Sequence, residues 1–129
     1  MTKGARSSRR QRFLIAMKTF ISFIVTSAIS IGIVAAQEGQ KVNVTMTEYK
    51  FDMPSTVKAG KTSFVIKNAG KKVHNFKIEG QGIDQKLSVN PKPGRTEMLE
   101  VVLKPGTYAI TCPVDFHTQK GMKTTLTVK

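Results

Sequence analysis

The sequence predicts an all-β fold, a sandwich or barrel built from about seven or eight short strands. Two observations carry this expectation. Apolar and polar residues alternate along several short stretches, as they do in strands with one buried face. Clusters of Gly, Pro and Asn separate these stretches at regular spacing, which is typical of turns between antiparallel strands.

The first predicted strand, residues 42–46, reads Val-Asn-Val-Thr-Met, so alternate side chains share one apolar face. The other predicted strands show similar alternation and cover residues 62–67, 75–79, 98–103, 107–111 and 123–128. The stretch 82–89 shows no such pattern, and either a loop or a short helical turn fits it. Four aromatic residues are expected in the core: Phe51, Phe64, Phe76 and Tyr108.

A basic and then apolar leader precedes the strands. Residues 1–36 hold six Lys or Arg and no acidic residue, and an apolar run from Phe20 to Val34 ends at two alanines. This order is typical of a secretory signal peptide, and the run is shorter than the ~20 residues of a membrane-spanning helix. We therefore expect export to the periplasm or another extracytoplasmic space, with residues 37–129 as one mature domain. An uncleaved signal that anchors the domain to the membrane is the alternative.

The start of the leader also has alternative interpretations. Met17 is followed by Lys-Thr-Phe and would begin a conventional signal peptide by itself, which would make residues 1–16 a mis-assigned extension. The segment 8–14, Ser-Arg-Arg-Gln-Arg-Phe-Leu, resembles a twin-arginine export motif in which the Phe comes one residue late.

Cys112, His117, Met122 and the upstream His74 form the most informative pattern in the chain. The chain has one Cys and two His, and all three fall in this pattern. A thiolate, two imidazoles and a thioether are the donor set of a mononuclear blue-copper site, which both Cu(I) and Cu(II) tolerate. The donors from Cys112 onward lie between the last two predicted strands, so their loop could curl around one ion.

Each of these residues has an ordinary explanation when taken singly, because a lone cysteine is most often a small buried hydrophobic residue. The four soft donors in this order favour a metal site over that explanation. The single cysteine excludes an internal disulfide. It also argues against a dinuclear copper site with bridging thiolates and against a multi-cysteine zinc site.

The segments 68–76 and 108–113, followed by His117 and Met122, resemble the cupredoxins, a family of small blue-copper proteins. The resemblance runs from about Gln40 to Lys129, and the Cys-x4-His-x4-Met spacing is most similar to the auracyanin- and rusticyanin-like members. It implies a Greek-key β-sandwich that binds one copper ion.

The resemblance also implies a role for individual residues. His74, Cys112 and His117 would be equatorial copper ligands and Met122 the axial one. Asn75 matches a position that braces the metal-site loops and tunes the thiolate. An apolar patch around the edge of His117 would be the docking surface and the electron exit, formed by Pro113, Val114, Phe116 and Gly121.

Charge limits the choice of partners. The chain has 21 Lys or Arg against eight Asp or Glu, and without residues 1–36 the net charge falls from +13 to +7. The remaining basic residues are scattered and no recognition motif accompanies them, so nucleic acid is not an expected partner. They either solvate the surface or steer docking to an acidic redox protein. The Lys71-Lys72 turn before His74 is unlike acidic plastocyanins, so the partner should differ from theirs.

These observations predict an exported, monomeric one-electron carrier that serves redox proteins such as a cytochrome, an oxidase or a reductase. It would not be an enzyme, because no substrate bond is made or broken. The alternative is an extracytoplasmic copper-binding protein for copper delivery or tolerance. Such proteins favour exposed Met- and His-rich sites, whereas Met46, Met53 and Met98 are scattered along this chain.

Overall fold

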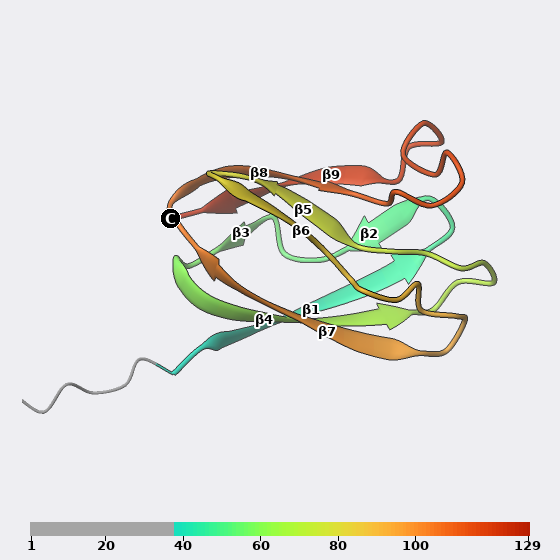
Figure 1. The fold of residues 1–129 in the computed structure, drawn as a ribbon, viewed down its shortest axis with the longest axis horizontal. Helices are drawn as coiled ribbons and strands as arrows, with labels where there is room; N and C mark the ends of the chain where they lie inside the picture. The colour runs from blue at the N-terminus through green and yellow to red at the C-terminus, as the bar shows by residue number, and fades with distance from the viewer. Residues whose placement is uncertain (1–37) are drawn as a thin grey trace, which may run out of the picture. The chain divides into compact units, whose positions relative to one another are not determined.

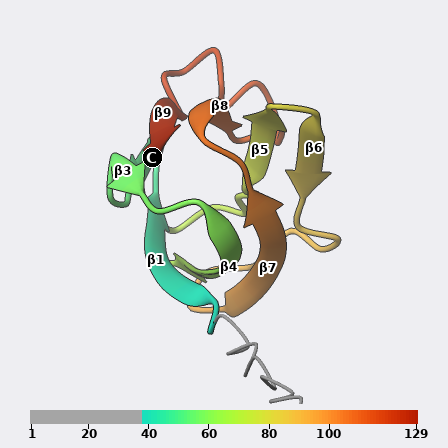
Figure 2. The same ribbon diagram turned by 90° about the vertical axis from the view of Figure 1, so that its left-hand side faces the viewer.

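Two β-sheets pack face to face in the computed structural model, which describes residues 38–129 (Figure 1). The predicted signal peptide, residues 1–36, lies outside the described residues. One sheet has the strand order β2-β1-β4-β7 and the other β3-β9-β8-β5-β6, and Figure 2 shows the two layers end-on. The strands are β1 (Gln40–Thr47), β2 (Lys50–Asp52), β3 (Thr56–Val57), β4 (Gly60–Asn68), β5 (Lys77–Gly80), β6 (Ile83–Lys86), β7 (Thr96–Leu103), β8 (Gly106–Thr111) and β9 (Lys123–Val128). This architecture confirms the predicted β-sandwich.

The alternation in residues 42–46 sets the register of the first sheet. Val42, Val44 and Met46 of β1 are buried. β1 runs parallel to β4, so Val42 lies beside Phe64 and Val44 beside Ile66 on the same inner face. A shift by one residue would expose this whole apolar set to solvent, which makes the register strongly specified.

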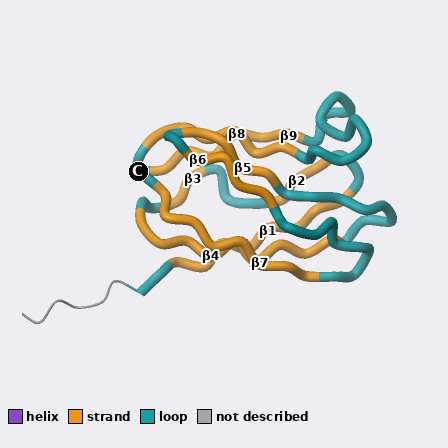
Figure 3. Tube along the Cα trace, in the orientation of Figure 1, coloured by secondary structure: helices purple, strands orange, loops and turns teal. Residues whose placement is uncertain are grey.

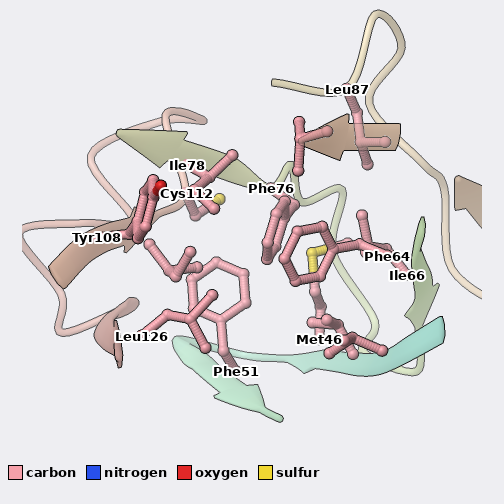
Figure 4. Close-up of a cluster of buried hydrophobic side chains, with 14 of the residues drawn as sticks. Met46, Phe51, Phe64, Ile66, Phe76, Ile78, Leu87, Tyr108, Cys112 and Leu126 are labelled. Carbon is pink, nitrogen blue, oxygen red and sulfur yellow. The ribbon is translucent and has the colours of Figure 1, made fainter. Parts of the chain in front are cut away.

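The second sheet presents matching apolar pairs to the same core. Ile78 of β5 lies opposite Ile110 of β8, and Tyr108 of β8 lies opposite Leu126 of β9, all fully buried. Phe76 lies between the two layers among these side chains (Figure 4). Its ring contacts Phe51 edge-on at 5.9 Å between centroids and Phe64 in a tilted arrangement at 5.1 Å. The predicted burial of the four aromatic residues is confirmed.

The interpretation of residues 82–89 as a loop or a short helical turn was wrong. Residues 83–86 form β6, an edge strand that pairs antiparallel with β5 through a turn at Gln81 and Gly82. Both turn residues have positive φ angles, +49° and +81°. Three of the four residues of β6 are exposed, so the strand has no alternating pattern that the sequence could reveal. The described residues hold nine strands, against the seven or eight expected; six of the nine correspond to ranges predicted from the sequence, and β2, β3 and β6 do not.

Several loops gather at the end of the sandwich opposite the C-terminus (Figures 1 and 3). They are the β1–β2 turn at residues 48–49, the β4–β5 loop at 69–76, the segment 87–95 and the β8–β9 loop at 112–122. The predicted metal donors all lie in these loops. No helix long and apolar enough to cross a membrane occurs between residues 38 and 129.

Candidate metal centre

The fold brings His74, Cys112 and His117 together in a buried cluster. One donor atom from each residue lies within 4.8 Å of the other two. The Nδ1 atoms of the two histidines are 3.2 Å apart, and the Cys112 Sγ is 3.5 Å from the His117 Nδ1. The three side chains are between 0 % and 4 % exposed. The sequence therefore predicted three residues that the folded chain places around one point, although 43 positions separate the two histidines.

The loop from Cys112 to Met122 is a compact structure held by its own backbone. The Cys112 amide donates to the Met122 carbonyl at 3.2 Å, and the Met122 amide donates to the His117 carbonyl at 3.0 Å. The hydroxyl of Thr118 donates to the Cys112 carbonyl at 2.7 Å. Gly121 adopts a φ of +100°, which a residue without a Cβ reaches freely. These bonds keep Cys112, His117 and the fully buried Met122 at one end of the core.

Asn75 connects the loop that carries His74 to its neighbours. Its backbone N–H points at the Cys112 Sγ at 3.4 Å. Its side-chain amide donates to the Leu87 carbonyl at 3.2 Å and to the Asn90 Oδ1, and its own Oδ1 accepts the Phe76 amide at 2.7 Å. These contacts connect the His74 loop to the segment from Leu87 to Asn90, and the N–H directed at sulfur would stabilise a thiolate.

The geometry of the donors fits one first-row metal ion. Imidazole nitrogen binds Zn²⁺, an ion of similar size to copper, at about 2.0–2.1 Å, so two nitrogens on one ion lie roughly 3–3.5 Å apart. The observed Nδ1–Nδ1 distance of 3.2 Å falls in this range. Within the described residues, the hydrogen-bond partners of these two nitrogens are each other and the Cys112 sulfur. Two imidazoles and one thiolate in a dry site suit copper better than Ca²⁺ or Mg²⁺, which prefer oxygen.

Electrostatics favour the form of His117 that binds metal. Burial lowers the pKa of His117, and Coulombic interactions with the neighbouring His74 and Lys120 lower it further. A metal ligand must be the neutral imidazole, because a protonated ring has no free lone pair at Nδ1. The lowered pKa reduces the competition between a proton and a metal ion for His117.

Two residues that sequence reasoning missed contact the histidines from the β1–β2 turn. Glu48 Oε1 lies 3.4 Å from the His74 Nε2, and the Tyr49 ring meets the His117 ring edge-on at 5.2 Å. Amide N–H groups of Lys72 and Lys71 lower the pKa of Glu48 to about 2. No local sequence pattern distinguishes Glu48 and Tyr49; the only signal is their position, just beyond the predicted strand 42–46.

The predicted docking patch lies on the outer side of the 112–122 loop. Phe116 is 76 % exposed, in a backbone conformation with a φ of +57°. Pro113 and Gly121 are also exposed, and Val114 is half-buried against the core. Such a high exposure is unusual for a phenylalanine whose only function is to pack in the core, and Phe116 directly precedes the buried His117.

Comparisons with known proteins agree with this geometry. The family model described as a cupredoxin-like domain matches residues 14–128. The dithionite-reduced auracyanin of Roseiflexus castenholzii is similar in structure, with a TM-score of 0.59 at 17 % identity, over 71 % of this chain and 99 % of that one. Auracyanin B gives a TM-score of 0.61 at 18 % identity, over 74 % and 93 % of the two chains. These low identities show a shared fold. A search among curated protein sequences finds no match.

Proposed function

The chain belongs to the cupredoxin-like family, and on this premise we propose that it is a type 1 copper protein that carries single electrons between redox proteins. The buried His74–Cys112–His117 cluster, with its donor atoms within 4.8 Å of one another, is the observation that carries the proposal. When bound, one copper ion supplies one-electron chemistry by alternating between Cu(I) and Cu(II). No substrate bond is made or broken, so the function is transport of electrons and not enzymatic catalysis.

Four residues hold the ion in this proposal. His74 and His117 bind through Nδ1 and Cys112 through Sγ, since these atoms face one another. Met122 is the last residue of the same loop and is fully buried, so its thioether would be the fourth and weakest ligand. Asn75 directs its N–H to the sulfur and braces the loops from behind.

Rigidity of the site is what suits it to electron transfer. An electron moves quickly only when the ligands need little rearrangement between the two oxidation states. The ligand loop is closed by backbone hydrogen bonds at both ends, and the adjoining Phe76 is locked into the aromatic core. A preformed, tightly packed ligand set of this kind resists the geometric change that either oxidation state would prefer.

Partner proteins are proposed to dock at the exposed surface around Phe116, Pro113 and Gly121, because electrons would leave through the adjacent edge of His117. Exposed lysines surround this end, including Lys71 and Lys72 of the β4–β5 loop and Lys120. Positive charges around an apolar centre favour a redox partner with an acidic rim and raise the rate of encounter at low salt.

The site geometry separates this proposal from copper delivery. Copper carriers exchange their ion through exposed ligands, whereas the four residues here are at most 4 % exposed. The test compares electron self-exchange, by NMR line broadening in mixtures of oxidised and reduced protein, with copper transfer to a chelator. We expect fast exchange and slow transfer. Fast transfer with negligible exchange would support the delivery function instead.

Residues 1–36 are proposed to direct export and to be removed, which leaves 37–129 as the extracytoplasmic domain. A basic segment, a short apolar run and a small-residue site support this. N-terminal sequencing of the native protein should begin at Gln37. A first residue earlier than this would contradict cleavage and favour a membrane-anchored form.

A further inference from the structure

Glu48 lies behind His74, on the side of the imidazole that faces away from the donor cluster. The ring presents Nδ1 to His117 at 3.2 Å and Nε2 to the Glu48 Oε1 at 3.4 Å. His74 is fully buried, while the Glu48 side chain is 34 % exposed. The carboxylate is therefore partly exposed to solvent and also contacts the buried Nε2 of His74.

The carboxylate is itself held in place by a structured turn. The Glu48 Oε1 accepts the amides of Lys71 at 2.5 Å and Lys72 at 2.9 Å. The turn that presents these amides is fixed by the buried Asn68, which donates to the Lys72 carbonyl at 2.8 Å and accepts the Gly70 amide at 2.9 Å. Two backbone N–H groups that donate to one carboxylate oxygen favour its ionised form. A fixed negative charge at this point is thus part of the folded structure.

Gly70 leaves the space that this contact requires. A Cβ at position 70 would lie 2.5 Å from the Glu48 Oε1 and 3.0 Å from the His74 Nε2. A side chain at this position would push the end of the Glu48 side chain away from the imidazole. Three separate features thus place a carboxylate against Nε2 of His74: the space left by Gly70, the turn held by Asn68, and Glu48 itself.

We propose that Glu48 is a positioning residue of the copper centre, which holds the proton of His74 on Nε2, directs the Nδ1 lone pair at the metal and favours Cu(II) over Cu(I). A neutral imidazole carries one N–H, and a carboxylate that accepts it at Nε2 selects the tautomer with a free Nδ1. Carboxylates in this position orient metal-bound histidines and raise their basicity. The negative charge, one imidazole ring from the ion, stabilises the more highly charged oxidation state. This inference rests on the proposed copper function.

The experiment uses Glu48→Gln, which keeps the shape and an acceptor oxygen but removes the charge. Glu100→Gln on β7 is the matched control, because it makes the same change in net charge at an exposed position on an edge strand. Gly70→Ala is the second variant: it retains the charge and displaces the carboxylate. Thermal unfolding of each metal-free protein verifies that the variants fold.

Two readouts test the proposal. In metal-free protein, at a pH where the imidazole is neutral, ¹⁵N NMR should find the single proton of His74 on Nε2 in the wild type. Glu48→Gln offers only a weaker, uncharged acceptor and Gly70→Ala displaces the carboxylate, so both variants should show a mixture of the Nδ1–H and Nε2–H tautomers. In copper-loaded protein, both variants should lose about tenfold in the ratio of Cu(II) to Cu(I) affinity, a rise of about 59 mV in reduction potential. An unchanged tautomer, or a potential equal to that of Glu100→Gln, would overturn the proposal. The NMR measurement needs no copper, so it tests Glu48 even if the electron-carrier function fails.

Discussion

Removing the side chain of Asn75 should weaken the fold without removing the hydrogen bond to the cysteine sulfur. In Asn75→Ala the backbone N–H that faces Cys112 remains, while the side-chain bonds to the Leu87 carbonyl and the Phe76 amide are lost. Asn75 is 3 % exposed, so water replaces these partners poorly. The variant therefore separates the bracing function of the residue from its effect on sulfur.

The magnitude follows from the groups left without a partner. A buried donor or acceptor that loses its partner costs about 1–3 kcal/mol. Two such groups, partly relieved by relaxation of the 87–95 segment, lower the free energy of unfolding by roughly 2–4 kcal/mol. A domain of this size has about 5–15 kcal/mol in total, so Asn75→Ala should still fold.

Urea denaturation of the metal-free protein measures this loss. With a denaturant slope of about 1.5 kcal/mol per molar, the midpoint should fall by roughly 1.3–2.7 M. Asn43→Ala is the control, because it makes the same substitution at an exposed position of β1 and should change stability by less than about 0.5 kcal/mol. Equal midpoints for the two variants would refute the bracing function. Loss of the thiolate absorption band in copper-loaded Asn75→Ala would refute the separation of the two functions.

Three further predictions follow from the site. Phe116→Glu should slow electron exchange with an acidic redox protein at least tenfold and leave the absorption spectrum unchanged, whereas Met98→Glu on β7 should affect neither; equal rates in stopped-flow would contradict the docking patch. Burial lowers the pKa of His117, so the unfolded metal-free chain binds this proton more readily and stability should decline as pH falls below about 6.5. The amides of Lys72 and Lys71 lower the pKa of Glu48 to about 2, so its contribution should persist above pH 4.5 and be lost between 4.5 and 2. A free energy of unfolding that does not change with pH across these two ranges would contradict both assignments. Copper at 1,000 times its dissociation constant should stabilise the protein by about 4 kcal/mol; calorimetry that detects no increase in unfolding temperature would contradict a site that exists only in the folded chain.

Local patterns in the sequence predicted most of the sandwich. Alternation in residues 42–46 and the aromatic residues at 64 and 76 report burial directly, because a strand with one buried face repeats every two residues. Strands β2 and β3 have three and two residues, too few to show a repeat, and β6 is exposed on most of its length. The parallel pairing of β1 with β4 depends on the whole fold and has no local signature.

The same distinction holds at the metal site. Cys112, His117 and Met122 lie within one loop, so their spacing was visible in the sequence. The rest of the surroundings depends on contacts across the fold. Glu48 meets His74 across 26 positions, and the need for glycine at position 70 arises only once both side chains have converged on it.

A visible absorption spectrum of the oxidised, copper-loaded protein, recorded beside a Cys112→Ser variant, tests the central claim most directly. The account predicts an intense thiolate-to-Cu(II) band near the red end of the spectrum in the wild type. The same band should be absent from the variant, which has lost the only sulfur in the His74–Cys112–His117 cluster. A wild-type protein that binds copper without colour, or a band that persists in Cys112→Ser, would contradict it.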